Sequence, residues 1–167
     1  MQKLLDAGCG EGYVLPVLSR GHPRAFFAAV DKRREALAFA RRNNPGVRYI
    51  EADILRLPFK EKTFDIVACT EVIEHIAGYR QVLQELKRVT AGYCLISVPY
   101  EPFFSLFRLL SGKNLLRGGR HPEHLHRFTK KEIIERIAEH FKIEKVVISL
   151  PWLVILGRAE PAGIPYG

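Results

Sequence analysis

The fold of this chain is decided by one stretch near its start, LLDAGCGEG, at residues 4–12. An apolar run ends in an acidic residue, three glycines follow at alternate positions, and an apolar segment comes after them. This order indicates a strand, a tight loop and a helix, because glycine lets the backbone turn sharply and approach a ligand closely. Open α/β sheets bind nucleotides at loops of this kind. We therefore expect the ligand site at this loop.

The composition indicates one globular domain over residues 1–167, with 47% hydrophobic and 26% charged residues. The sequence contains no run of about 18 apolar residues, so no membrane span is expected. We find no secretory signal pattern. Cys9, Cys69 and Cys94 lie in or beside apolar segments without metal-ligand spacing, which favours reduced core thiols in a cytoplasmic protein. The net charge of +8 suits either solubility or an anionic partner.

Strands alternate with helices along most of the chain. The expected strands are 3–7, 25–30, 47–52, 64–70, 93–99, 143–150 and 152–159. Helices are expected after the glycine loop, over 33–43, around 82–89 and from the capping box that begins at Thr129, with a helical turn over 71–76. The alternation predicts a doubly wound parallel sheet. Pro151 separates the last two strands and favours a closing antiparallel pair, whereas 101–128 has no clean strand–helix unit and reads as an insertion at the rim.

Three aspartates stand at the ends of three predicted strands, namely Asp6, Asp31 and Asp53. The carboxyl ends of parallel strands lie along one rim, so we expect these side chains to share a crevice. Asp31 comes about 20 residues after the glycine loop, where a carboxylate accepts both hydroxyls of a ribose. The loop differs from a dinucleotide-binding loop, because the bulky Tyr13 stands where a small residue is needed. The loop is also acidic, which fits a ligand whose contacting end carries a positive charge.

Several segments together resemble class I S-adenosylmethionine-dependent methyltransferases. In order they are LLDAGCGEG, VDKRREALAFARRN, EADILRLPF, FDIVACTEVIEHI, LQELKRVTAGYCLISVP and EHLHRFTKKEI. The resemblance implies a Rossmann-like α/β/α sandwich whose seven-stranded sheet has the order 3-2-1-4-5-7-6, with one antiparallel strand. It also implies S-adenosylmethionine as cofactor and S-adenosylhomocysteine as product.

The same resemblance implies cofactor contacts along the ends of the first four strands. The glycine loop would lie against the methionine part, with Asp6 organising it, and Asp31 would hold the ribose. Asp53 and the backbone at Ile54 would bind the adenine amino group. The complete set of expected cofactor residues is Asp6, Gly8, Cys9, Gly10, Gly12, Asp31, Lys32, Asp53, Ile54, Thr70 and Glu71.

Methyl transfer from a sulfonium needs alignment above all, and a base only where the nucleophile holds its proton tightly. The candidate catalytic residues are Glu71, His75 and His124, with His126 as a further histidine. In a helical turn, Glu71, Glu74 and His75 would share one face. That arrangement resembles the ExxEH…H metal site of small-RNA 2′-O-methyltransferases, but the same string occurs in ubiquinone-biosynthesis-type O-methyltransferases, and we assign no metal.

The acceptor is expected to bind near residues 103–131, which hold seven basic residues, one acid and four phenylalanines. This composition favours an anionic or amphiphilic small molecule, methylated at oxygen or nitrogen. An RNA acceptor is less favoured, because RNA binding usually needs a broader basic surface. A cofactor-binding module without catalysis also stays open. The first strand begins almost at Met1, so either the rim segment or a second subunit, as in a homodimer, would cover the site, or this start is internal to a longer protein.

Overall fold

The computed structural model describes residues 1–101, 103 and 125–160. Most of the predicted rim insertion, together with His124 and the segment 161–167, lies outside these described residues. The part of the chain that the structure describes contains no helix long and apolar enough to cross a membrane.

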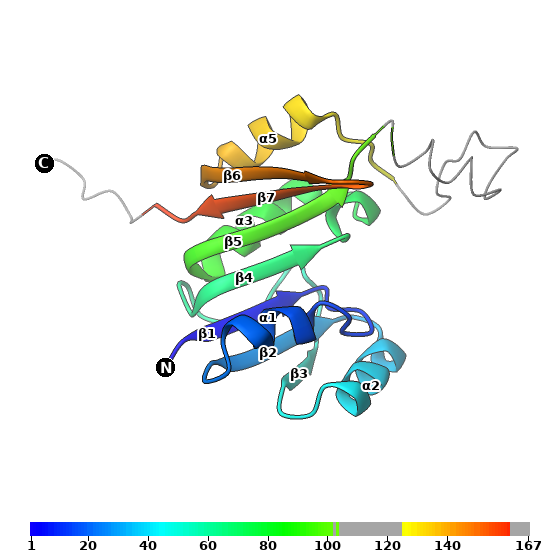
Figure 1. The fold of residues 1–167 in the computed structure, drawn as a ribbon, viewed down its shortest axis with the longest axis vertical. Coiled ribbons are helices and arrows are strands. Elements are labelled where there is room, and N and C mark those ends of the chain that lie inside the picture. The colour runs from blue at the N-terminus through cyan, green and yellow to red at the C-terminus, as the bar shows by residue number, and fades with distance from the viewer. Residues whose placement is uncertain (102, 104–124, 161–167) are drawn as a thin grey trace, which may run out of the picture.

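One seven-stranded sheet forms the centre of the molecule, in the order β3-β2-β1-β4-β5-β7-β6. Its strands are β1 (Lys3–Ala7), β2 (Phe26–Asp31), β3 (Arg48–Glu51), β4 (Phe64–Thr70), β5 (Thr90–Pro99), β6 (Lys142–Ser149) and β7 (Trp152–Arg158). The first five strands pair in parallel, and β7 runs antiparallel to both β5 and β6 (Figure 1). The predicted fold class, strand order and closing antiparallel pair are confirmed.

Helices lie on both faces of the sheet (Figure 1). They are α1 (Leu15–Gly21), α2 (Arg34–Asn43), α3 (Tyr79–Val89) and α5 (Lys130–Ala138), with a single 3₁₀ turn, η1 (Ile73–His75). The apolar side chains of α3 and α5 pack with the larger core, whereas α1 and α2 close a smaller cluster around Leu15, Ala29 and Leu37. At the start of α5, Thr129 Oγ1 accepts a hydrogen bond from the Glu132 amide at 3.2 Å, as the capping box predicts.

The fifth strand starts earlier than expected, at Thr90 instead of Tyr93, so that α3 passes into β5 without a loop. Thr90 is buried, and its hydroxyl donates to the Leu86 carbonyl at 2.6 Å. Gly92 then permits the close approach of β4, because a Cβ there would stand 2.5 Å from the Asp65 carbonyl oxygen. The hydrophobic pattern alone conceals this start, since Ala91 and Gly92 are residues that strands disfavour.

Gly157 of β7 should resist any enlargement. A Cβ at this position would lie 2.6 Å from the Phe141 Cβ, on a core side chain that has no space to retreat. We expect Gly157→Ala to lower the free energy of unfolding by about 1–3 kcal/mol. Urea unfolding followed by circular dichroism measures this change.

Gly21→Ala is the matched control. A Cβ at Gly21 meets nothing within 4 Å. Because alanine restricts the unfolded chain, this variant should gain up to about 1 kcal/mol. An equal response of the two variants would contradict the packing of Phe141 on β7.

Candidate functional site

A cavity of about 960 Å³ opens at the carboxyl ends of β1, β2 and β4. Nine of the eleven predicted cofactor residues line it, namely Gly8, Cys9, Gly10, Asp31, Lys32, Asp53, Ile54, Thr70 and Glu71. His75 also lines it, with Tyr13, Arg33 and Trp152 among further wall residues. The crevice predicted from three strand ends is therefore present, although Asp6 and Gly12 do not reach its surface.

The glycine loop is held in place by the strand beside it. The amides of Gly8 and Cys9 donate to the Val30 carbonyl at 2.8 and 2.9 Å. Gly8 and Gly10 adopt positive φ angles of +80° and +51°, which favour glycine. A Cβ on Gly8 would also stand 2.6 Å from a methyl of Val72, so the loop after β4 closes directly over it.

Asp31 connects the loop to the end of β2. One carboxylate oxygen accepts the Gly10 amide at 2.8 Å, and the other accepts the Arg33 amide at 2.8 Å. The Arg33 guanidinium adds an ion pair at 3.5 Å, although that arginine is largely exposed. Each oxygen retains capacity for one more donor, so this carboxylate is able to hold a ligand hydroxyl while it holds the loop.

Asp6 lies behind the loop and is 2% exposed. Among the residues that the structure describes, neither of its carboxylate oxygens has a hydrogen-bond partner. Burial, and to a smaller degree the negative charge of Asp31, raises the pKa of Asp6 to about 7. Burial also raises the pKa of Cys9 to about 12, so that this residue is a neutral thiol. The three cysteines are buried and free, as predicted.

Gly12 packs closely against α2 and the residue that follows it within the described structure. It is buried, and a Cβ there would lie 3.0 Å from the Ala40 Cβ and 3.0 Å from the Asn44 amide nitrogen. Asn44 also donates to the Gly12 carbonyl at 3.2 Å. The third glycine of the loop thus sits against α2 and not on the cavity wall.

Asp53 and Ile54 form the cavity wall beyond β3. Asp53 accepts the Leu55 amide at 2.9 Å through one oxygen, which makes a tight turn. Ile54 is buried against the larger core. These two residues share one wall of the cavity, as expected from the sequence.

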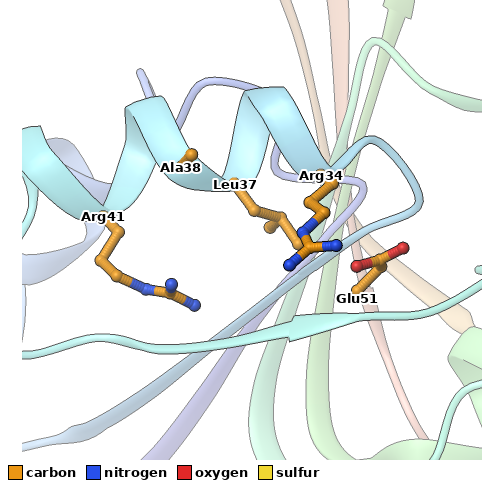
Figure 2. A pocket seen from close by; sticks show the side chains of 5 residues that line it. All are labelled: Arg34, Leu37, Ala38, Arg41 and Glu51. Carbon is orange, nitrogen blue, oxygen red and sulfur yellow. The ribbon is translucent and has the colours of Figure 1, made fainter.

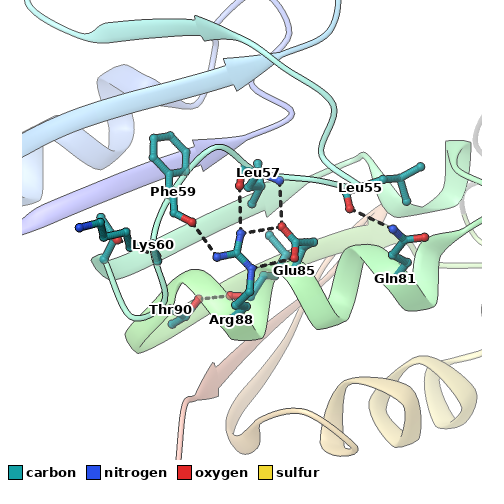
Figure 3. A network of polar contacts seen from close by, with 10 residues as sticks. Leu55, Leu57, Phe59, Lys60, Gln81, Glu85, Arg88 and Thr90 are labelled. Atoms are coloured by element: carbon teal, nitrogen blue, oxygen red, sulfur yellow. Dashed lines mark hydrogen bonds and ion pairs between the residues drawn. The ribbon is translucent and has the colours of Figure 1, made fainter.

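The loop that carries this wall is anchored on α3 (Figure 3). The Arg88 guanidinium donates to the Leu57 carbonyl at 2.9 Å and to the Phe59 carbonyl at 2.6 Å, and it pairs with both oxygens of Glu85 at 2.8 Å. Glu85 in turn accepts the Leu57 amide at 2.8 Å, and Gln81 donates to the Leu55 carbonyl at 3.1 Å. These bonds fix residues 55–59 on α3.

Glu71 has the most constrained geometry in the site. Its φ is +56°, in the left-handed region that a non-glycine residue enters rarely. Its amide donates to the Ser97 carbonyl at 3.2 Å. One carboxylate oxygen accepts the Ser97 hydroxyl at 2.9 Å, and the other accepts the Trp152 indole N–H at 2.6 Å. Burial raises the pKa of Glu71, while these two donors oppose the rise.

The expected helical turn over 71–76 is wrong in its first half. Only Ile73–His75 is helical, and Glu71 precedes it in the left-handed conformation. Glu71, Glu74 and His75 therefore do not share a helical face. Glu74 instead is 1% exposed with both oxygens unbonded, and burial raises its pKa to about 8. Within the described ranges, no group of three potential metal ligands occurs.

The histidines separate into two environments. His75 is half-buried and lines the cavity. His126 lies away from the cavity wall, where a ring nitrogen meets the Ile76 carbonyl at 3.1 Å and the ring packs edge-on against Tyr79. His126 is thus a packing residue in this structure, and His124 lies outside the described residues.

Sequence analysis missed Ser97 and Trp152. Both belong to strands distant from the glycine loop, and no local motif marks them. The strand order contained a signal, however. An antiparallel β7 beside β5 begins at the rim where the parallel strands end, so its first residue, Trp152, faces Pro99 there.

A second, smaller hollow of about 570 Å³ lies between α2 and β3 (Figure 2). Arg34, Leu37 and Arg41 extend from α2 toward the strand, and Glu51 stands at the strand end. Its charged side chains are exposed, so it lacks the buried polar groups of the main cavity.

The chain is similar in sequence to known proteins of one family. The family model described as "Methyltransferase domain" matches residues 5–96. A demethylmenaquinone methyltransferase of Thermus thermophilus is 34% identical over 106 residues, which are 60% of this chain and 48% of that protein. A ubiquinone biosynthesis O-methyltransferase of Rickettsia akari is 33% identical over 86 residues, 50% of this chain and 34% of that protein. The chain therefore spans less than half the length of these curated relatives.

Solved structures share the fold at low identity. A SAM-dependent methyltransferase from Aquifex aeolicus has a TM-score of 0.74 at 17% identity, covering 95% of this chain and 82% of that chain. A Haloferax volcanii protein, solved in a complex with the Trm112 methyltransferase activator, has a TM-score of 0.76 at 17% identity with the same coverages.

The buried acids should make stability depend on pH. The pKa of Asp6 rises from 3.8 to about 7 on folding, so between these values the folded protein binds more protons than the unfolded chain. The free energy of unfolding should consequently fall as pH rises through this window. Asp6→Asn should flatten the fall and exceed the wild type at pH 8 by at most about 4 kcal/mol. Urea unfolding between pH 4 and 8 tests this.

Glu74→Gln is the companion variant, and its effect should extend to about pH 8, where the pKa of Glu74 lies. Asp65→Asn, a change of an exposed carboxylate at the opposite end of the sheet, should keep the wild-type slope. A wild-type stability that rises with pH across this window would contradict the desolvation of Asp6 and Glu74.

Arg88 should matter for the loop on α3. Removing its guanidinium leaves the Leu57 and Phe59 carbonyls without their donor, which costs about 1–3 kcal/mol. We expect Arg88→Met to lose that stability and to speed amide hydrogen exchange in residues 55–59. Lys87→Met, an exposed neighbour on α3, should change stability by less than about 0.5 kcal/mol. Equal losses in both variants would rule out the anchoring role.

Proposed function

Because the chain belongs to the methyltransferase domain family, we propose that it transfers a methyl group from S-adenosylmethionine to an oxygen or nitrogen of a small organic acceptor. One observation carries the proposal. A single cavity joins a glycine loop to the carboxylates Asp31, Asp53 and Glu71, each from the end of a different strand. Acids that follow three separate strands all line this cavity, which supports a ligand with several hydrogen-bond donors.

The residues present fit this cofactor. Gly8 and Gly10 line the cavity with their backbone at positive φ, and just behind them lies the Asp6 carboxyl, whose oxygens accept no hydrogen bond from the described residues. That combination suits an ammonium group at the methionine end. Asp31 has acceptor capacity left for ribose hydroxyls. Asp53 and Ile54 offer a carboxylate beside an apolar wall, which suits an adenine ring.

S-adenosylmethionine supplies an electrophilic methyl group whose departure leaves a neutral thioether. The chain's own residues then have three tasks: to align the reactants, to exclude water and to take up a proton if the nucleophile carries one. Glu71 is our candidate for the proton acceptor, because its carboxylate lines the cavity and accepts two hydrogen bonds that favour its ionised form. His75, on the same wall, is the alternative.

A small organic acceptor is supported by the kinds of relatives found. The two relatives described above are named for ubiquinone biosynthesis and for demethylmenaquinone. We propose an acceptor of comparable size, anionic or amphiphilic in character, in place of RNA. A partner subunit over the site, such as a second copy, remains a prediction.

Calorimetric titration tests the cofactor directly. We expect S-adenosylmethionine and S-adenosylhomocysteine to bind with micromolar dissociation constants, and NADH not to bind. Asp31→Asn should weaken both sulfur nucleosides about tenfold to a hundredfold, as expected for the loss of hydrogen bonds to a charged group.

Asp65→Asn is the matched control, because Asp65 also accepts a main-chain amide, that of Lys3 at 2.8 Å, but at the opposite end of the sheet. It should bind the nucleosides as the wild type does. Unchanged affinity in Asp31→Asn would refute the ribose assignment. Binding of NADH in preference to the sulfur nucleosides would refute the cofactor itself.

A further inference from the structure

The Glu71 side chain is held by groups that come from outside the strand–loop–helix units. Ser97 lies near the end of β5, and Trp152 is the first residue of β7. Together they place one hydrogen-bond donor on each carboxylate oxygen, at 2.9 and 2.6 Å. The backbone is fixed by the same strand, since the Glu71 amide donates to the Ser97 carbonyl.

This arrangement exceeds what packing requires. A left-handed residue costs free energy and persists where its surroundings over-determine it, often at functional sites. Trp152 remains 39% exposed and lines the cavity, so its ring is not a core side chain. The indole N–H nevertheless makes the shortest side-chain contact to Glu71.

The two donors leave the Glu71 carboxylate able to accept further hydrogen bonds. A carboxylate has about four acceptor positions, and Ser97 and Trp152 occupy one on each oxygen. Both oxygens keep room for another donor on the cavity side. The carboxylate is held at a set angle while it can still accept a proton-bearing group.

We propose that Ser97 and Trp152 are positioning residues that hold the Glu71 carboxylate toward the acceptor of the methyl group. This inference rests on the proposed function and deepens it. The acceptor then carries a hydroxyl or an amine hydrogen, because a carboxylate fixed in this way binds a hydrogen-bond donor.

The contact can be observed without any ligand. Trp152 is the sole tryptophan of the chain, so a ¹H–¹⁵N correlation spectrum contains one indole signal. In the wild type this signal should lie downfield and exchange slowly with solvent. Glu71→Met should move it upfield and speed its exchange, and Glu71→Gln, which keeps the side-chain volume, should do so to a smaller degree. Glu74→Gln should leave the signal in place. An indole signal unaffected by both Glu71 variants would overturn the proposal.

The second measurement concerns turnover. Methyl transfer is followed with labelled S-adenosylmethionine and the metabolite fraction that the wild type methylates. Trp152→Phe keeps a ring but loses the N–H, and Ser97→Ala loses the hydroxyl. Each should lower kcat about tenfold to a hundredfold while the KM for S-adenosylmethionine stays within about twofold. Tyr93→Phe, which removes an exposed hydroxyl from the same strand β5, should change neither.

These readouts separate the two claims. A wild type that does not bind S-adenosylmethionine would contradict the proposed function, whatever the indole signal shows. Normal cofactor binding with an unchanged kcat in Trp152→Phe and Ser97→Ala would overturn the positioning role alone. A matching rise in the KM for S-adenosylmethionine would show that the pair supports the cofactor pocket generally, which also contradicts our inference.

Discussion

The carboxylate of Asp31 makes the interaction on which the site depends. By accepting the amides of Gly10 and Arg33, it joins the loop after β1 to the turn after β2. These contacts add to the main-chain bonds from Gly8 and Cys9 to Val30, and they continue the connection beyond the last paired residues of the two strands. The loop therefore takes its shape from a side chain about 20 residues further along the chain, as the spacing of nucleoside-binding loops requires.

A second feature of this rim is that it buries two acidic side chains. Asp6 and Glu74 are almost fully buried, and none of their four oxygens is hydrogen-bonded to a residue within 1–101, 103 or 125–160. Desolvation makes the ionised form of each costly, which is why both pKa values rise. A domain with marginal stability tolerates such groups at few places, and functional sites are the usual ones. Asp6 is placed behind the glycine loop, where a cationic ligand group would compensate its charge.

The cavity is assembled from two kinds of architecture. The parallel units supply the loop, Asp31 and Asp53, whose positions follow from strand ends. The antiparallel strand β7 also contributes to the cavity wall, because its first residue lies at the rim where β5 ends. Glu71 lies directly after β4, and its carboxylate is hydrogen-bonded to Ser97 of β5 and to Trp152 of β7. The cavity wall thus combines residues of the parallel strand–loop units with a residue of the antiparallel strand.

The amino-acid sequence by itself determined the glycine loop, the strand-end aspartates and the strand–helix order, since these depend on local backbone preferences and on hydrophobic periodicity. Only the tertiary structure decided where the side chains meet. It turned Glu71 out of the helical geometry that EVIEH suggests, it buried Glu74, and it put Gly12 against α2. It also brought Ser97 and Trp152 to Glu71. The Glu71 contacts join residues 26 and 81 positions apart, and the Gly12 contact with Asn44 joins residues 32 apart, which no local pattern contains.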